Sequence, residues 1–394
     1  SYEGILGDSS GNVCSDPRAQ VIPLLYGFYI CVLSPFFLLF FIFVMGTRKE
    51  DPLWQEIPEH KWLWEMDYQT ACAATMIERL DKTNQKYGRC RAVGNKNSGT
   101  TKGPWTFLNY KEYMDEILSF GRFLIDMGGD KAAPVCILSF NRPEWFITDI
   151  ACMFAGLVPA GIYPTDTSSG VKYIVNHSEC QFVVVENQRQ LEKIRVIRNS
   201  LVHVKEIVVY EDIGTKVSLD KLGLRATAAE EEKARDAAEQ EASGTDEFLI
   251  EEESEWAENF ESHVHYWNDI RKKYYVKRSS RGGKRKKGLG YTHTELCPAE
   301  HIQKLDDEGL RRRSECKPED VICMIYTSGT TGAPKCVMIT HRNIGWCIYS
   351  ISVLVHVCPE DSMVSYLPLC HIAEKVCSLY GPATFGCNVY FAAS

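Results

Sequence analysis

A nine-residue segment in the last fifth of the sequence combines the side chains expected of a phosphate-binding loop. Its two glycines let the backbone bend and approach a ligand closely. Its four hydroxyl side chains and its backbone N–H groups offer donors to phosphate oxygens, and its final lysine adds a mobile positive charge. The apolar run Val321–Tyr326 before it predicts a buried strand that would hold the loop on a rigid edge. The segment reads Thr327-Ser328-Gly329-Thr330-Thr331-Gly332-Ala333-Pro334-Lys335.

This segment does not fit the main alternative, a Walker A loop. That loop requires G-x-x-x-x-G-K followed by Ser or Thr. Here Pro334 precedes Lys335 and Cys336 follows it, which disfavours a P-loop kinase or GTPase. A surface turn rich in Ser, Thr and Gly is a second alternative, and the preceding apolar strand and the placed lysine argue against it.

The elements that must position this loop alternate along the chain. A short strand at 106–109 precedes a helix whose apolar residues recur at spacings of four, three and four, at Tyr113, Ile117, Phe120 and Leu124. Another helix begins at about Pro143. This alternation predicts an α/β fold with helices packed on a largely parallel sheet. The other predicted strands are Val135–Phe140, Ala160–Tyr163 and Phe182–Val185.

Composition narrows the class of protein. With 394 residues, 45% hydrophobic and 24% charged, the chain can form two or three globular domains. The net charge of −8 argues against a general nucleic-acid binder. The 16 cysteines form no C-x-x-C pair and no Cys/His cluster at zinc spacing, so we interpret them as reduced, buried residues of a cytosolic domain.

A long apolar stretch near the N-terminus predicts a membrane anchor at residues 21–45. At about 1.5 Å per residue this stretch is long enough to cross a hydrocarbon core of roughly 30 Å. A buried core helix and a cleaved signal peptide are the alternatives; the run is long for either, and no basic segment precedes it. Arg48 and Lys49 follow the span, so the positive-inside rule predicts a single-pass protein with residues 1–20 non-cytosolic and the bulk cytosolic, although Glu50 and Asp51 dilute the signal. The endoplasmic reticulum is the membrane we expect.

Blocks of like charge interrupt the chain between residues 225 and 317. Because such blocks repel and stay solvated, we predict a surface insertion with little fixed structure. Its basic part could instead meet anionic lipid on the cytosolic leaflet. The predicted organisation is therefore a first domain part at 46–224, the insertion at 225–317 and the phosphate-loop part at 318–394. The charged blocks comprise Glu230–Glu232, Glu251–Glu253, Arg271–Lys273 and Lys284–Lys287.

Four segments together resemble the adenylate-forming superfamily, which includes acyl-CoA synthetases, luciferases and peptide-synthetase adenylation domains. Thr327–Lys335, with Tyr326 before it and Thr340-His341 after it, resembles the phosphate-binding signature of the superfamily. The set is most similar to the bubblegum-type long-chain acyl-CoA synthetases, over about residues 60–215 and 318–394. One departure is Cys336, where that family usually has Gly. The other three segments are Ser365–Glu374 (SYLPLCHIAE), Asn141–Trp145 (NRPEW) and Ala160–Thr165 (AGIYPT).

The resemblance implies the N-terminal domain of a fatty acid:CoA ligase that uses ATP, Mg²⁺ and coenzyme A. A long-chain carboxylate would attack the α-phosphorus of ATP, and the CoA thiol would then displace AMP. It implies that Thr327 helps to hold magnesium, that Lys335 balances the phosphate charge and that His371 lies near the carboxylate. The alternative for His371 is a core histidine, and Glu374 could cap the following helix. The implied nucleotide-binding set is Thr327, Ser328, Gly329, Thr330, Thr331, Gly332, Ala333, Pro334 and Lys335, and the implied catalytic set is Lys335 and His371.

The family also has segments that this sequence does not contain: a Tyr-Gly-x-Thr-Glu that stacks adenine, a Thr-Gly-Asp that holds ribose, and a small C-terminal domain with a catalytic lysine. We therefore expect this chain alone not to complete the reaction. Two alternatives stay open, a membrane-anchored nucleotide-binding or scaffold protein and an adenylating enzyme for another carboxylic acid. The sequence identifies no protein partner.

Overall fold

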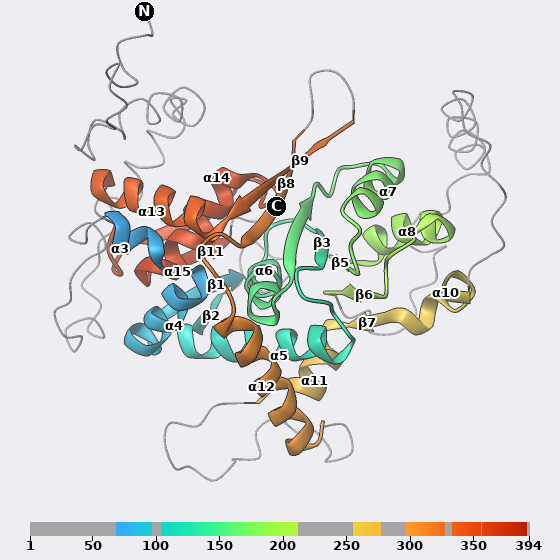
Figure 1. Ribbon diagram of the computed structural model, residues 1–394, viewed down its shortest axis with the longest axis horizontal. Helices are drawn as coiled ribbons and strands as arrows, with labels where there is room; N and C mark the ends of the chain where they lie inside the picture. Colours follow the sequence, from blue (N-terminus) through green and yellow to red (C-terminus); the bar gives the residue numbers. More distant parts are fainter. Residues whose placement is uncertain are drawn as a thin grey trace, which may run out of the picture.

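The computed structural model describes residues 68–96, 104–211, 255–276, 297–327, 333–355 and 357–391. A seven-stranded sheet in the order β7-β6-β5-β3-β4-β8-β9 lies at its centre (Figure 1). Neighbouring strands run parallel from β7 to β8, and β9 pairs antiparallel with β8. The strands are β3 (Pro134–Leu138), β4 (Val158–Ile162), β5 (Phe182–Val185), β6 (Glu206–Val209), β7 (Val264–Tyr266), β8 (Val321–Thr327) and β9 (Lys335–Thr340).

A second, four-stranded sheet has the order β10-β11-β1-β2. Three of its strands run parallel, and β2 is antiparallel to β1. The sequence analysis predicted β2 alone among these four strands. They are β1 (Arg91–Lys96), β2 (Trp105–Asn109), β10 (Ser362–Ser365) and β11 (Asn388–Phe391).

Helices cover both faces of the larger sheet, as a parallel sheet requires. The longer helices are α4 (Met76–Tyr87), α5 (Tyr110–Asp126), α6 (Pro143–Ala155), α7 (Ser168–His177), α8 (Gln188–Ile197), α11 (Trp267–Tyr274), α12 (Ala299–Ser314) and α13 (His341–Val355). Shorter elements are α3 (Tyr68–Ala73), α10 (Glu255–Glu258), α14 (Ile372–Glu374), α15 (Gly381–Phe385), the 3-10 turns η4 (Arg198–Ser200) and η6 (Phe260–His263), and the π-helical turn η7 (Lys375–Tyr380).

Strand β3 shows how the side-chain alternation of a strand divides the core. Val135 and Ile137 belong to one hydrophobic cluster, which includes residues of α5 and α6 and of the smaller sheet. Cys136 and Leu138 point to the opposite face, where α7 and α8 pack. The predicted α/β fold with a largely parallel sheet is therefore confirmed, with helices between the two sheets and a further helical layer outside.

The predicted helix starts follow ordinary capping chemistry. Asn109 and Glu112 form a reciprocal capping box at the start of α5. Pro143 occupies the first turn of α6, where its missing N–H is not needed, and Gly156 ends that helix with a φ of 75°. Both helices begin where the sequence predicted them.

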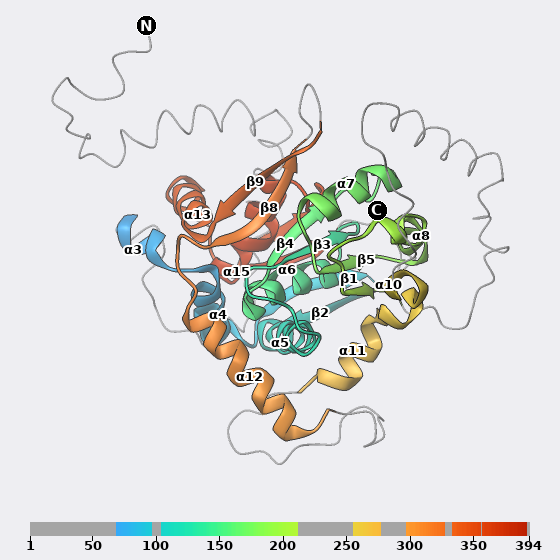
Figure 2. The ribbon, with the colours of Figure 1, turned by 45° about the vertical axis from the view of Figure 1, so that its right-hand side comes forward.

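The prediction of an insertion with little fixed structure at 225–317 is wrong for 255–276 and 297–317. These residues form β7, which extends the larger sheet, and α11 and α12, which pack on either side of α5 (Figure 2). Arg122 of α5, whose side chain is 4% exposed, makes a bidentate ion pair with Asp306 of α12, at 2.7 and 3.0 Å. Arg271 of α11 pairs with Glu116 of α5, with Nε 2.8 Å from Oε2. Charged residues of both segments thus pair with residues of α5.

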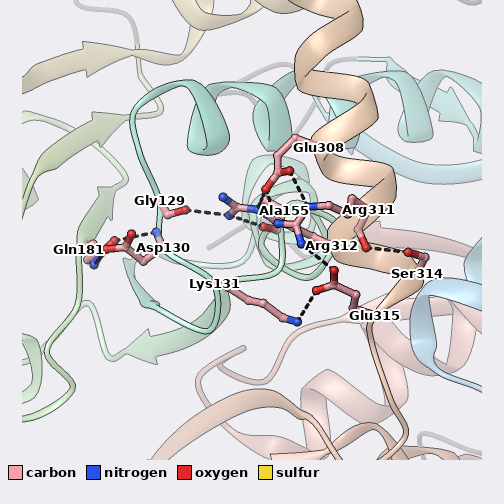
Figure 3. A network of polar contacts seen from close by, with 10 residues as sticks. All are labelled: Gly129, Asp130, Lys131, Ala155, Gln181, Glu308, Arg311, Arg312, Ser314 and Glu315. Carbon is pink, nitrogen blue, oxygen red and sulfur yellow. Dashed lines mark hydrogen bonds and ion pairs between the residues drawn. The ribbon is translucent and has the colours of Figure 1, made fainter.

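Helix α12 also caps two other helices (Figure 3). The Arg312 guanidinium donates to the carbonyl oxygen of Gly129, beyond the end of α5, at 2.7 Å and to that of Ala155, at the end of α6, at 3.0 Å. Glu308, one turn earlier, holds the guanidinium in place at 2.7 Å. A positive charge at helix C-termini also interacts favourably with the helix dipole.

Two predictions fall on residues outside the described part of the chain. The anchor at 21–45 lies there, as do 225–254 of the charged insertion and its basic run at 284–287. Among the described residues, no helix is both long enough and apolar enough to cross a membrane.

We predict that Arg312→Ala lowers the free energy of unfolding by about 2–4 kcal/mol, because two carbonyl groups lose a charged donor. Urea unfolding would measure this change. Arg311→Ala is the matched control: Arg311 lies next in the sequence but makes exposed ion pairs with Glu308 and Glu315, so we expect a much smaller loss. Equal losses in the two variants would contradict the capping role of Arg312.

Candidate active site

The ends of the predicted phosphate loop lie side by side at the tip of a hairpin. Thr327 ends β8 directly opposite Lys335, which begins β9. The Thr327 hydroxyl donates to the Lys335 carbonyl oxygen at 3.4 Å, and both residues are exposed. Ser328–Gly332 lie outside the described residues, whereas Ala333 is exposed and Pro334 half-buried. The fold therefore presents a hydroxyl and an ammonium group at the mouth of this loop.

The hairpin begins at the carboxyl edge of the larger sheet. Strand β8 runs parallel to β4, which runs parallel to β3 and, through it, to β5. The carboxyl ends of these strands therefore meet at one edge, which is where open α/β sheets bind their ligands. The segments that follow β3 and β4, at 141–145 and 163–165, are two of those that the sequence analysis singled out.

Asn141 joins the segment after β3 to the segment 365–374. Its side-chain amide donates to the Ser365 hydroxyl at 2.9 Å and to the Leu367 carbonyl oxygen at 2.6 Å. Its side-chain oxygen accepts from the Leu369 N–H at 3.1 Å. With both ends of its amide in use, Asn141 fixes the path of the chain leading to His371.

Gly161 of β4 brings a third segment to the same place. A Cβ atom at this position would lie 2.8 Å from the Cα of Cys370. Because that distance is shorter than any real contact of this kind, only glycine allows the two backbones to approach so closely. The segments 141–145, 160–165 and 365–374, far apart in the sequence, thus converge beside the strand that carries the hairpin.

His371 lies on the surface of this cluster and is not a core histidine. It is exposed, and its Nδ1 accepts a hydrogen bond of 3.1 Å from the Ala373 N–H at the start of α14. A neutral ring that accepts at Nδ1 carries its proton on Nε2. The backbone N–H of Ala373 therefore orients the ring through Nδ1, and the Nε2–H group takes no part in this hydrogen bond.

Glu374 braces the same turn from inside. It is 2% exposed and accepts from the Tyr366 N–H at 3.1 Å, so it holds the loop before α14 in addition to lying within that helix. Burial raises the pKa of Glu374 above its usual value. Its role in the described structure is to position the backbone of 366–374.

A fully buried ion pair anchors the next turn, and the sequence analysis did not single it out. Lys375 Nζ lies 2.7 Å from Asp149 of α6, both side chains are 0% exposed, and the Tyr380 hydroxyl donates to the other Asp149 oxygen at 2.9 Å. Burial alone would lower the pKa of Lys375, but the Asp149 carboxylate outweighs it and raises that pKa. An aspartate in the apolar run Phe146–Phe154 was the signal that could have suggested a buried charge.

His341, which follows the hairpin, is a buried neutral histidine. It is 3% exposed, and its Nδ1 accepts from the Met76 N–H at 3.1 Å. Burial lowers its pKa to about 4, and burial raises the pKa of neighbouring Cys316, 3.3 Å from Nε2, to about 11. At neutral pH neither group is charged, so this pair lacks the thiolate of a Cys–His nucleophile.

The residues present fit a nucleotide better than a protein-held metal. An exposed lysine and hydroxyls suit phosphate oxygens, and no group of three His, Cys, Asp or Glu that could hold a metal occurs in the described ranges. Mg²⁺ fits only if Thr327 contributes one oxygen and phosphates and water supply the rest, the usual arrangement for this ion.

Cys336, where the family usually has Gly, packs against the core cluster under α7 and α8.

The fold and the converging segments define an α/β enzyme domain with its site at the carboxyl edge of the larger sheet. Residues 80–394 match the model of the AMP-binding enzyme family. Because this match covers most of the sequence, the chain belongs to that family.

Sequence relatives support the resemblance to the bubblegum-type ligases at a distant level. The long-chain-fatty-acid–CoA ligase ACSBG2 of Gallus gallus is 28% identical over 324 residues, which cover 81% of this chain and 33% of that protein. The ligase ACSBG1 of Rattus norvegicus is 27% identical over 323 residues, covering 81% and 34%. The chain therefore spans about a third of the length of these curated relatives.

Solved structures support the fold. The anthranilate CoA ligase AuaEII in complex with anthranoyl-AMP matches with a TM-score of 0.53 and 16% identity, covering 84% of this chain and 47% of that one. The A-PCP didomain of the carboxylic acid reductase of Segniliparus rugosus, in complex with AMP, matches with the same TM-score and identity, covering 83% and 40%. The predicted N-terminal domain fold of an adenylate-forming enzyme is thereby confirmed.

We predict that His341 makes stability depend on pH. Its pKa falls from 6.5 to about 4 on folding, so between these values the unfolded chain binds one more proton than the folded chain. Stability should therefore fall by about 3 kcal/mol as the pH drops from about 6.5 to 4. Urea unfolding across this range would measure it. His341→Asn keeps an acceptor near Nδ1 but cannot titrate, so parallel pH curves for variant and wild type would contradict the assignment.

We also predict strong coupling between Lys375 and Asp149. Lys375→Met should cost about 3–5 kcal/mol, because it leaves a buried carboxyl without its partner, and Asp149→Asn should cost a similar amount. The double variant should lose less than the sum of the two by at least about 2 kcal/mol. Additive losses in urea unfolding would show that the two groups do not depend on each other.

Proposed function

We propose that the protein is a long-chain fatty acid:CoA ligase that activates a fatty acid with ATP. The observation that carries this proposal is the convergence of 141–145, 160–165 and 365–374 at the carboxyl edge, beside the hairpin that holds Thr327 and Lys335. A scaffold protein has no physical need for this arrangement. The relatives' names supply the substrate class and coenzyme A. Mg²⁺ belongs to the proposal because it is the usual partner of nucleotide phosphates.

The proposed reaction has two half-reactions. A carboxylate oxygen of the fatty acid attacks the α-phosphorus of ATP, the bond between the α- and β-phosphates breaks, and pyrophosphate leaves. The CoA sulfur then attacks the acyl carbonyl carbon, its thiol proton is released, and AMP leaves as the thioester forms. The enzyme's contribution is mainly positioning and neutralisation of charge.

The residues of this chain have distinct parts in the proposal. Lys335 and the loop Thr327–Pro334 bind the β- and γ-phosphates, and the Thr327 hydroxyl contributes an oxygen to magnesium. His371 lies near the carboxylate of the fatty acid, and a hydrogen bond from the Ala373 N–H orients its ring. Asn141 and Glu374 position the backbone that carries His371.

The proposal includes attachment to a membrane. Residues 21–45 form the anchor, residues 1–20 are non-cytosolic and the enzyme domain lies in the cytosol, at the endoplasmic reticulum. A long acyl chain partitions into lipid and would reach the site from the bilayer surface. Extraction of membranes with carbonate tests this part, since release of the full-length protein into the supernatant would contradict the anchor.

We predict that Lys335→Gln lowers fatty-acid-dependent ATP–pyrophosphate exchange by about a hundredfold, because a charge that stabilises the departing phosphates is lost. Exchange reports the first half-reaction and would be measured on the full-length protein. Lys317→Gln is the matched control, since Lys317 is also exposed and lies before the hairpin. We expect this control to exchange within about twofold of the wild type.

The choice of acid separates the alternatives. Exchange with palmitate and not with coumarate or amino acids supports the fatty-acid ligase. Exchange with another acid alone would assign a different adenylating activity. ATP binding without exchange for any acid would favour a nucleotide-binding scaffold.

A further inference from the structure

Two side chains of helix α7, which lies beside the hairpin in Figure 2, contact the chain at the two points where the phosphate loop leaves the hairpin. The Tyr173 hydroxyl donates to the Pro334 carbonyl oxygen at 3.1 Å. One turn later, His177 Nδ1 lies 3.0 Å from the hydroxyl oxygen of Tyr326. Pro334 directly precedes Lys335, and Tyr326 directly precedes Thr327, so each contact lies one residue from a proposed phosphate-binding residue.

These two side chains act from one face of the helix. Tyr173 and His177 are four residues apart, and their rings lie 5.3 Å apart. The His177 ring meets the Tyr326 ring edge-on, with centroids 5.7 Å apart. Helix α7 begins at Ser168, shortly after the segment 160–165, with Thr167 as its N-cap. That segment is therefore linked to the hairpin through this helix.

The hairpin needs such a contact because one of its strands is held on one side. In the part of the chain that the structure describes, β9 is an edge strand whose sheet neighbour is β8. Val337 and Met338 of β9 are 43% and 63% exposed. Without α7, the start of β9 would be positioned only by its pairing with β8 and by the packing of Cys336 on the core.

The contact to Pro334 bears directly on Lys335. The carbonyl group of Pro334 and the nitrogen of Lys335 belong to one planar peptide unit. A hydrogen bond that fixes this carbonyl oxygen therefore fixes the plane from which the Lys335 side chain departs. The ring of Pro334 restricts its φ as well, so few backbone rotations are left near this point.

We propose that Tyr173 is a positioning residue that orients Lys335 toward the phosphates of a nucleoside triphosphate. This inference rests on the proposed function of the hairpin as a nucleotide-binding loop. Tyr173 does not touch the nucleotide; it acts through the Pro334 carbonyl group. His177 of the same helix makes the second contact with the hairpin, to Tyr326 of β8.

The test compares Tyr173→Phe with the wild type in the full-length protein, using Mg-ATP as the probe. Removing one hydroxyl leaves the ring in place, and we expect the Kd for ATP, measured by calorimetry, to rise about fivefold. The KM for ATP should rise similarly and kcat should fall, because Lys335 also stabilises the departing phosphates, whereas the KM for palmitate should stay within about twofold. Tyr274→Phe is the matched control: it removes the hydroxyl that donates to Asp126, the last residue of α5 and not part of the proposed site, so ATP binding should not change.

A second measurement separates positioning from general support of the fold. If Tyr173 acts through Lys335, then Tyr173→Phe should have no further effect on the Kd for ATP in a Lys335→Gln background. Additive effects would overturn the proposal. An unchanged Kd in Tyr173→Phe, or an equal rise in the KM values for ATP and palmitate, would also overturn it.

The proposed function can fail independently. If the wild type binds ATP but exchanges with no fatty acid, the ligase assignment fails, and the Kd comparison still decides the role of Tyr173. If the wild type does not bind ATP, both proposals are overturned.

Discussion

The central strands β3 and β5 are apolar on both faces, and the rest of the described structure follows from the need to cover them. All five residues of β3 and all four of β5 are buried. A parallel sheet of this kind is stable when helices pack on both sides, and each crossover brings the next strand back in the same direction. The carboxyl ends of β3, β4, β5 and β8 are therefore forced to one edge. The segments 141–145 and 163–165 occupy that edge because they follow β3 and β4, and 365–374, which follows β10 of the smaller sheet, meets them there.

The parts of the fold that the sequence predicted well have short-range signals. The unbroken apolar run at 182–185 coincides with β5, and the capping pair Asn109 and Glu112 lies at the predicted start of α5. The smaller sheet was missed because its central pairing joins Val93 to Val389. Strand β1, with the sequence RAVGNK, has little apolar character of its own. It becomes a strand by pairing with β2 on one side and with β11, from the other end of the chain, on the other.

Charge misled the sequence analysis for a related reason. The basic and acidic residues of 255–276 and 297–317 were interpreted as mutually repelling and solvated. In the structure Arg271 meets Glu116 and Arg122 meets Asp306, and these partners are 155 and 184 residues apart in the sequence. A count of charge within a window cannot distinguish a solvated block from one face of an interface. The hydrophobic side of the same helices, including Trp267 and Ile270, is buried against α5 and its neighbours.

For the site, the sequence identified the segments but not the atoms that join them. Asn141 and Gly161 lie within two of the segments that the sequence analysis singled out. Their contacts with 365–370, however, depend on the register of β3 and β4. Lys375 and Asp149 were not singled out at all. The role of Lys335 came from the chemistry of its loop, whereas the roles of Thr327 and His371 came from resemblance, since an exposed residue carries no packing signal that reports its function.

The buried pair of Lys375 and Asp149 shows what this arrangement requires of the core. Two charges removed from water often contribute no more stability than apolar residues of similar volume. The pair contributes specificity here. Apolar side chains could pack against α6 in more than one register, whereas the Lys375 ammonium group has a single carboxylate, that of Asp149, as its partner. Lys375 directly follows Glu374 and lies four residues after His371, so its register fixes the turn that carries both. Asn141, on the loop between β3 and α6, contacts the beginning of the segment 365–374, and the Lys375–Asp149 pair holds its end. The exposed part of the site is thus positioned by polar contacts that are themselves buried or half-buried.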